Sequence, residues 1–405
     1  MNHRHGVLAL VFIMLVGIFT SEAPANEELG TRLDGKETHE FLMPFDVEAK
    51  AAFLYEPEAG TILYAKNPDH PLPPASITKV MTLLLAFEAL DTGVASWDDM
   101  IIVSENAWRM GGAQMFLEIG QEVSFRDLLT GISVISANDA CIAMAEHLKG
   151  SESFFVQRMN ERAAKLGMSN TRFQNSTGLP ADDHYMSARD IAILAREIVL
   201  NHPGLLEMEA MREFTFNGIR QFNRNPLLGR YPGADGLKTG WTKEAGYSLV
   251  GTAKQKEFRL ISVVLDTPSA KVRSDVSRQL MDYGFRNFVM REVVSPGDIL
   301  GTIPVSRGKE KTVPVTVERP LKCMIASGRV DRVNVTYGVN KNLQAPAPRG
   351  ERVGTVKVLI DNDIVARGEL VTLAEVERAG FFSRLFRAIG DFFKSIIATI
   401  FRSSN

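Results

Sequence analysis

The chain has 405 residues, of which 45% are hydrophobic, and its formal net charge is −2. This length is sufficient for two domains with real hydrophobic cores, whereas the near-neutral charge gives no overall basic field and argues against nucleic acid as a partner. The composition therefore indicates a globular protein whose function resides in a local site.

The N-terminus has the features of a secretory signal peptide. A short basic start precedes an apolar run from Val7 to Phe19, and Ala23 and Ala25 have the spacing of an A-x-A cleavage site. A first transmembrane helix is the less favoured alternative, because the apolar run is too short to span the hydrocarbon core comfortably. We expect residues 1–25 to be removed and the mature protein to be exported to the periplasm.

The body of the chain, residues 46–290, alternates between strand and helix patterns. After a polar, acidic lead-in at residues 26–45, residues 51–69 form two apolar runs around a Glu-Ala-Gly turn, which predicts a hairpin. Strand patterns return at residues 246–254 and 258–266. Helical periodicity marks six segments, at residues 76–90, 125–135, 138–148, 153–167, 186–202 and 272–289. This order predicts a sheet covered by helices, with a helical lobe beside it.

The C-terminal part has a different character. From about Val293 the sequence alternates apolar and polar residues between Gly- and Pro-rich turns, which predicts a small β domain at residues 291–376. Residues 377–405 place Phe and Ile on one face of a predicted helix and mostly cations on the other. We expect this tail to lie in a membrane interface, on the outer face of the inner membrane. A helix docked on the β domain is the alternative.

Ser76 and Lys79 are spaced to share one face of a helix. Pro73 and Pro74 are placed to start that helix, which puts Ser76 in the first turn, where free backbone N–H groups can hold an oxyanion. A serine nucleophile needs a base, and Lys79 acts as one only when neutral, which requires about 4 to 5 kcal/mol relative to its ordinary pKa. The pair therefore predicts a buried Lys79 with a second cation nearby.

Two later segments offer partners for this pair. Lys238 is the candidate cation. If its segment is a strand, Lys238 and Thr239 can face a substrate, and Gly240, without a Cβ atom, lets an extended ligand lie against the backbone. Ser136 and Asn138 lie between two apolar helical runs, where the hydroxyl can relay a proton to a leaving amine and the amide can orient it.

Neither cysteine pairing nor metal binding is indicated by the sequence. Cys141 lies in a helical stretch and Cys323 in the β-rich region, with no short-range spacing pattern, so a disulfide is not expected. The seven histidines form no H-E-x-x-H or Cys/His ligand spacing. We expect no metal and no cofactor.

In this order, the S-x-x-K, S-x-N and K-T-G motifs resemble the signature of the penicillin-recognising serine enzymes. More specifically, the chain resembles the low-molecular-weight penicillin-binding proteins that are D-alanyl-D-alanine carboxypeptidases of the serine peptidase family. The stretches that carry this resemblance are "PPASITKVMT", "SANDAC", "NSTGLP", "MSARDIAILAREI", "DGLKTGWT" and "AGYSLVGTA". The similarity extends over nearly the whole mature chain, including the β domain and the tail.

The resemblance implies a β-lactamase/transpeptidase-like fold, an α/β (α+β) architecture in which helices and a helical lobe cover an antiparallel sheet. A small all-β domain and a terminal amphipathic helix follow this domain. It also implies an enzyme of peptidoglycan biosynthesis and cell shape that removes the terminal D-alanine from pentapeptides without a cofactor. β-Lactam antibiotics are then expected to acylate the enzyme and to leave slowly.

The resemblance further implies roles for individual residues. Ser76 forms the acyl-enzyme and Lys79 is its base, while Ser136 and Asn138 complete the proton path. Lys238 with Thr239 binds the terminal carboxylate of the substrate.

Two other residues receive implied roles. The backbone N–H of Trp241 joins that of Ser76 in the oxyanion hole. Some family members carry His where this chain has Trp241, but only the backbone is needed there. Arg273 aligns with an arginine that assists carboxylate binding, a role that suits a guanidinium; a helix-surface cation is the alternative.

Other functions share parts of this pattern. A class A β-lactamase adds an E-x-x-L-N segment, which Glu197 to Asn201 match. However, that string ends a long helix well beyond the expected offset from Ser136, so we interpret Glu197 as a solvated helix residue. A D,D-endopeptidase acting on cross-links would use the same site. A weakly catalytic penicillin-binding scaffold would instead depend on the β domain and the tail.

Overall fold

A computed structural model describes residues 45–340 and 342–380, which fall into two compact units that meet in sequence at Phe288 and Val289. The predicted signal peptide, the lead-in up to residue 44 and the tail from residue 381 lie outside the described residues. No helix within the described part is long and apolar enough to cross a membrane.

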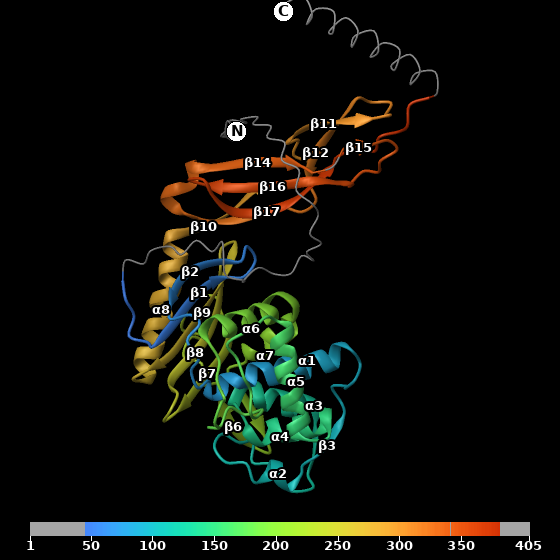
Figure 1. Ribbon diagram of the computed structural model, residues 1–405. Coiled ribbons are helices and arrows are strands. Elements are labelled where there is room, and N and C mark those ends of the chain that lie inside the picture. The colour runs from blue at the N-terminus through green and yellow to red at the C-terminus, as the bar shows by residue number, and fades with distance from the viewer. Residues whose placement is uncertain (1–44, 341, 381–405) are drawn as a thin grey trace, which may run out of the picture. The chain divides into compact units, whose positions relative to one another are not determined.

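The first unit is built on a five-stranded antiparallel sheet with the order β2-β1-β9-β8-β7 (Figure 1). The predicted hairpin forms β1 and β2, and the segment containing Lys238 is the edge strand β7. The strands are β1 (Ala51–Glu56), β2 (Thr61–Lys66), β7 (Ala234–Thr242), β8 (Gly246–Gln255) and β9 (Phe258–Thr267).

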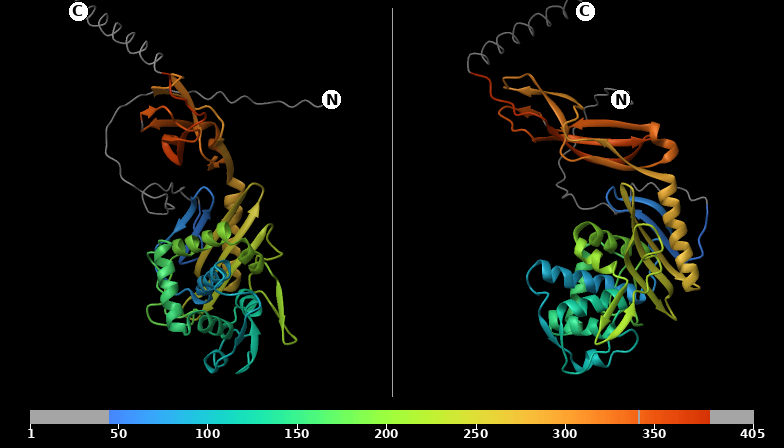
Figure 2. Two further views of the ribbon diagram at one scale, coloured as in Figure 1. Left: turned by 90° about the vertical axis from the view of Figure 1, so that its right-hand side faces the viewer. Right: turned by 180° about the vertical axis from the view of Figure 1, so that it is seen from behind.

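Helices cover both faces of this sheet. Helix α8 lies along one face, whereas α6, α7 and the short turn η1 pack against the other, where the remaining helices form a lobe (Figure 2). The predicted mixed fold, with helices on an antiparallel sheet, is thus confirmed. The helical elements are η1 (Ala75–Thr78), α1 (Lys79–Asp91), α2 (Glu105–Trp108), α3 (Phe125–Thr130), η2 (Gly131–Ile135), α4 (Asn138–Lys149), α5 (Glu152–Lys165), α6 (Ala188–Asn201), α7 (Pro203–Glu209) and α8 (Ala270–Asn287).

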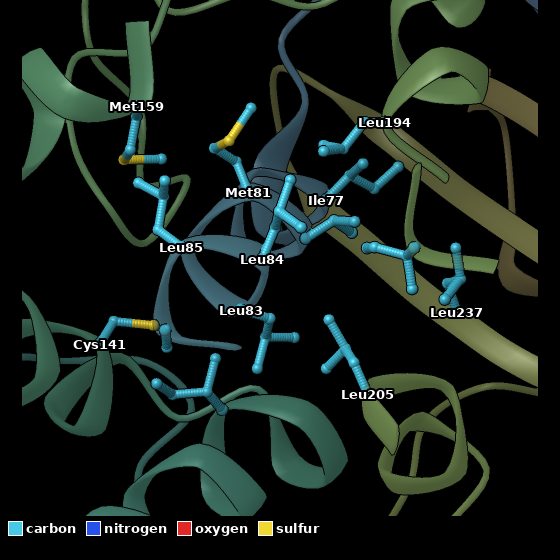
Figure 3. Close-up of a cluster of buried hydrophobic side chains, with 14 of the residues drawn as sticks. Ile77, Met81, Leu83, Leu84, Leu85, Cys141, Met159, Leu194, Leu205 and Leu237 are labelled. Atoms are coloured by element: carbon cyan, nitrogen blue, oxygen red, sulfur yellow. The ribbon is translucent and has the colours of Figure 1, made fainter. Parts of the chain in front are cut away.

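Helix α1 runs through the core of the lobe. All of its residues from Lys79 to Phe87 are buried, as expected for a helix that is apolar on every side. Figure 3 shows Met81, Leu84 and Leu85 of α1 among side chains from the surrounding elements. Because Lys79 is the first residue of this helix, the packing of the core holds its backbone in place.

The sequence patterns did not predict two short two-stranded sheets. They consist of β3 (Met100–Ile102) with β4 (Glu122–Ser124), and β5 (Glu213–Phe216) with β6 (Ile219–Phe222). Strands of three or four residues are too short to show a clear alternation.

The second unit is β-rich, as predicted, with its own hydrophobic core. Its six-stranded sheet has the order β14-β16-β17-β12-β11-β15, and β10 pairs with β13. The elements are β10 (Phe288–Val294), β11 (Gly301–Ser306), β12 (Thr312–Val317), β13 (Leu321–Ala326), η3 (Ser327–Arg332), β14 (Val333–Val339), β15 (Leu343–Gln344), β16 (Arg352–Ile360) and β17 (Asp363–Thr372).

Candidate active site

Ser76 lies in η1, a single 3₁₀ turn that leads directly into α1, so the two prolines precede this turn and not the α-helix itself. The turn begins with Ala75 in the left-handed region, at φ +48°. Two glycines let other segments approach it closely. A Cβ atom on Gly178 would collide with the carbonyl oxygen of Ala75, and one on Gly240 would lie 2.7 Å from that of Pro74. The loop at Gly178 and strand β7 thus hold the serine turn between them.

Lys79 is completely buried and points at the serine. Its Nζ donates a hydrogen bond to Ser76 Oγ at 3.1 Å and another to the carbonyl oxygen of Thr177. Burial is the main cause that lowers the pKa of Lys79 to about 8; the positive charge of Arg224 contributes to the lowering, whereas Cys141 and Asp139 oppose it. The amine is therefore partly neutral near physiological pH, which is the condition for accepting the serine proton.

Lys238 occupies the middle of β7 and is 4% exposed. Side chains two residues apart on a strand share a face, so Lys238 projects on the side where Gly240 meets the serine turn. Burial also lowers the pKa of Lys238; Glu209 opposes this effect, whereas the charges of Lys79 and Arg224 add to it. The structure thus places a second cation close enough for its charge and that of Lys79 to act on each other.

Ser136 follows the π-helical turn η2 and is held in the left-handed conformation, at φ +65°. Its hydroxyl is buried and has no hydrogen-bond partner among the described residues. Two residues later, Asn138 starts α4, and its side-chain amide donates to the carbonyl oxygen of Gly111 at 2.7 Å. The structure therefore joins Lys79 to Ser76 by a hydrogen bond and to Lys238 by the interaction of their charges. It shows no direct hydrogen bond from Ser136 to any of the three.

Trp241 and Arg273 lie near the end of the same strand. Trp241 is 57% exposed, and its ring lies 5.8 Å from that of Tyr247, its cross-strand neighbour on β8. Arg273 extends from α8 over Tyr247, with 5.9 Å between its guanidinium carbon and the ring centre. Its Nε is buried without a partner among the described residues. Arg273 is therefore not a solvent-exposed cation on the helix surface, which was the alternative interpretation. Thr239, between Lys238 and Gly240, is buried.

Cys141 lies one turn into α4, near both lysines, whose charges act on its thiol. Burial raises the pKa of this thiol to about 12, so it is neutral. Cys141 and Cys323 are both buried and carry free thiols.

Glu197 differs from the sequence interpretation, which made it a solvated helix residue. It is half-buried on α6, where its carboxylate accepts a hydrogen bond from Arg162 at 2.8 Å. Arg162 also bonds Glu88 at 2.6 Å, and His202 lies beside Glu197. Glu88, Glu197 and His202 have ligand atoms close enough together to hold a metal ion, but the guanidinium of Arg162 supplies the positive charge there. We interpret the group as a structural ion-pair network.

Arg224 and Glu209 also act on the lysines, as does Asp139 beside Asn138, and no sequence pattern indicated a role for Arg224 or Glu209. Arg224 lies in the segment after β6 and Glu209 ends α7. Neither belongs to a motif, and each reaches the lysines only through the fold. Gly178 was within a recognised stretch, but only the structure shows that it makes room for the serine turn.

Comparison with known families agrees with this geometry. Residues 36–269 match the peptidase S11 family of D-alanyl-D-alanine carboxypeptidases, and residues 288–378 match the C-terminal domain of penicillin-binding protein 5. The D-alanyl-D-alanine carboxypeptidase DacF of Bacillus subtilis is 37% identical over 367 residues, which cover 89% of this chain and 93% of that protein. DacA of Escherichia coli is 35% identical over 347 residues, or 84% of this chain and 86% of its own.

Solved structures give the same result. Penicillin-binding protein 5 from Haemophilus influenzae superposes with a TM-score of 0.77 at 35% identity, covering 84% of this chain and all of the other. Penicillin-binding protein D2 from Listeria monocytogenes, solved with ampicillin bound, has a TM-score of 0.56 at 35% identity and covers 60% of this chain and all of its own. The chain therefore belongs to the penicillin-binding, serine-type D-alanyl-D-alanine carboxypeptidases that act on cell-wall peptidoglycan.

Proposed function

We propose that Ser76 carries the acyl-enzyme of this D,D-carboxypeptidase and that Lys79 is the base that activates it. The observation that supports this assignment is the hydrogen bond from Lys79 Nζ to Ser76 Oγ, made by an amine whose pKa burial lowers to about 8. In its neutral form Lys79 takes the hydroxyl proton as Ser76 Oγ attacks the carbonyl carbon of the penultimate D-alanine. The carbonyl oxygen of Thr177 keeps the amine oriented.

The developing oxyanion is held by the backbone N–H groups of Ser76 and Trp241. This assignment is supported by the close approach of β7 to the serine turn, which Gly240 permits. N–H groups aimed at the tetrahedral oxygen stabilise the transition state more than the ground state. The missing Cβ atom of Gly240 thus makes room for the serine turn and also lets an extended ligand lie against the strand.

Lys238 and Thr239 bind the terminal carboxylate of the substrate, with Arg273 near the end of the same strand. A buried ammonium is a strong partner for a carboxylate, because little water competes with it. Asn138 borders the acyl side, and the unpartnered hydroxyl of Ser136 passes the proton from Lys79 to the leaving amine of D-alanine. That transfer breaks the peptide bond and leaves the acyl group on Ser76 Oγ.

Hydrolysis of the acyl-enzyme then uses Lys79 a second time, as the base for an attacking water. A β-lactam acylates the same serine, but its leaving group stays attached to the acyl part. The candidate deacylating residue of a β-lactamase, Glu197, is held on α6 by Arg162. A β-lactam adduct on Ser76 is therefore expected to be long-lived.

We also propose that the protein is exported and held peripherally at the outer face of the inner membrane. The sequence of residues 1–25 supports export, and the apolar face with opposing cations in residues 381–405 supports attachment to an anionic lipid surface. The substrate, peptidoglycan pentapeptide, is found in that compartment.

Mass spectrometry after incubation with ampicillin tests the site. The expected result is a mass increase on the proteolytic peptide that carries Ser76, with acylation slowed roughly 10²- to 10⁴-fold in Lys79→Ala. An adduct on another serine would refute the assignment.

The preference for substrate needs a second measurement. Purified protein is mixed separately with pentapeptide monomer and with cross-linked dimer, and the released D-alanine and monomer are quantified. Release of D-alanine from the monomer at the higher rate is expected; faster cleavage of the dimer would assign the protein to the D,D-endopeptidases.

A further inference from the structure

Glu209 is a buried carboxyl group that none of the steps above uses. It is the last residue of α7 and is 1% exposed. Both of its carboxyl oxygens lack a hydrogen-bond partner among the described residues. Because a buried carboxyl without a partner is unfavourable, the position calls for an explanation.

The surroundings of Glu209 lead to the carboxylate-binding strand. Helix α7 packs on β7, and a Cβ atom on Gly236 would lie 3.5 Å from the Cβ of Glu209. Lys238 is two residues further along that strand. The other polar group beside the carboxyl is the hydroxyl of Ser133 in η2; it is buried and lowers the pKa of Glu209, although the two groups do not meet the geometry of a full hydrogen bond.

Lys238 is surrounded by repulsive charges except for this carboxyl. The groups that act on it come from four directions: Glu209 on α7, Lys79 on α1, Arg224 after β6, and Cys141 on α4. The Cys141 thiol is neutral because burial raises its pKa to about 12. Burial raises the pKa of Glu209 to about 8, and the charge of Lys238 opposes this rise. Glu209 is therefore the one group among these four that can carry a negative charge beside the ammonium, chiefly on the alkaline side of neutrality.

We propose that Glu209 is a positioning residue, the internal counter-ion that keeps Lys238 protonated and ready for the terminal carboxylate of the substrate. Lys238 makes no direct ion pair with Glu209 or with any other described residue, so its ammonium remains available to the ligand while the carboxylate acts on it electrostatically. This inference rests on the role proposed above for Lys238.

The pH dependence of turnover tests it. In Glu209→Gln the side-chain size is kept but the negative charge is lost, so Lys238 gives up its proton at lower pH. For a peptide ending in D-Ala-D-Ala, the alkaline rise in KM should move about one pH unit toward acid, with a smaller change in kcat. For the same peptide ending in an amide, which has no carboxylate to bind, the profile should not move.

Two further variants make the result specific. Glu56→Gln is the matched control, because Glu56 is a fully buried carboxyl on β1 whose oxygens bond the backbone N–H groups of Glu58 and Ala59; its KM profile should superpose on that of the wild type. Glu209→Asp, which retains the charge one methylene further away, should give an intermediate shift. If Glu209→Gln does not fold, the pH dependence of KM in Glu209→Asp tests the same inference.

The outcomes separate this inference from the proposed function. If the wild-type KM shows no carboxylate-dependent alkaline rise, the role given to Lys238 is wrong. If that rise is present but unshifted in Glu209→Gln and Glu209→Asp, or shifted equally in Glu56→Gln, the counter-ion role is wrong and the carboxyl is a neutral, structural group.

Discussion

In the proposed mechanism, the ionisation of Lys79 controls the chemistry. Its pKa of about 8 means that the neutral, active form increases as pH rises, so the acylation rate constant for a β-lactam should grow about tenfold per pH unit below 7 and level off above 8. Lys79→Arg, which stays charged, should lose roughly 10²- to 10⁴-fold at pH 8 and above, and the loss should shrink as pH falls, because the wild type also loses its neutral base there. Stopped-flow acylation between pH 5.5 and 8.5 measures both. A rate independent of pH over this range would remove Lys79 as the base.

His184 contacts Thr78, the residue that directly precedes α1, and should make the stability of the fold sensitive to acid. Its Nε2 is 2.8 Å from the hydroxyl of Thr78, and burial lowers its pKa to about 4. Because the unfolded chain binds this proton more tightly, stability is present above pH 6.5 and is lost as pH falls toward 4. Between pH 7.5 and 4.5, this titration should lower the free energy of unfolding of the wild type by about 2 to 3 kcal/mol, and His184→Gln should not show this part of the loss.

Urea unfolding of wild type and His184→Gln at the two pH values gives this difference. The glutamine retains a hydrogen-bonding group for Thr78, so its stability at pH 7.5 separates the loss of the bond from the loss of the titration. Equal acid sensitivity in both proteins would show that other groups dominate.

Among the secondary elements, the contact between the Gly178 loop and the serine turn should be the least tolerant of added volume. Gly178 has φ +81°, and a Cβ atom there would overlap the carbonyl oxygen of Ala75. Gly178→Ala therefore has to displace η1, and we expect a loss of at least 2 kcal/mol in the free energy of unfolding together with slower β-lactam acylation.

Gly218 provides the control for that substitution. It has a similar backbone angle, φ +76°, but a Cβ atom there would meet nothing within 4 Å. Gly218→Ala thus reports the cost of the left-handed conformation alone, about 1 kcal/mol, with acylation unchanged. Thermal unfolding and acylation rates of the two variants are compared. If they behave alike, backbone strain and not the approach to Ala75 explains the requirement for Gly178.

For the molecule as a whole, the sequence predicted most of the architecture. The β1–β2 hairpin, the buried helix after Lys79, the α6 helix and the C-terminal β unit follow from local periodicity, which a single sequence displays. The three motifs could be found because each is a short string, although their meaning came from resemblance. Arg224 and Glu209 could not be found, because only tertiary packing brings an isolated charge to a distant lysine. The left-handed turn at Ser136 likewise depends on its surroundings.

Attachment to the membrane is the prediction that concerns the whole chain. A chain ending at Gly380 keeps the described β unit intact, including the hydrogen bond from the Ala379 N–H to the Arg307 carbonyl oxygen, and removes the Phe- and Ile-rich segment with its cations. Because apolar burial and cation–lipid attraction both come from that segment, the mature full-length protein should sediment with anionic vesicles and the shortened one should not. Both should acylate with ampicillin at the same rate, which shows that the site is intact. Phe386→Asp, in the full-length protein, should weaken binding by placing a charge on the apolar face. If the shortened protein also sediments with the vesicles, the membrane contact lies elsewhere in the chain and the prediction is wrong.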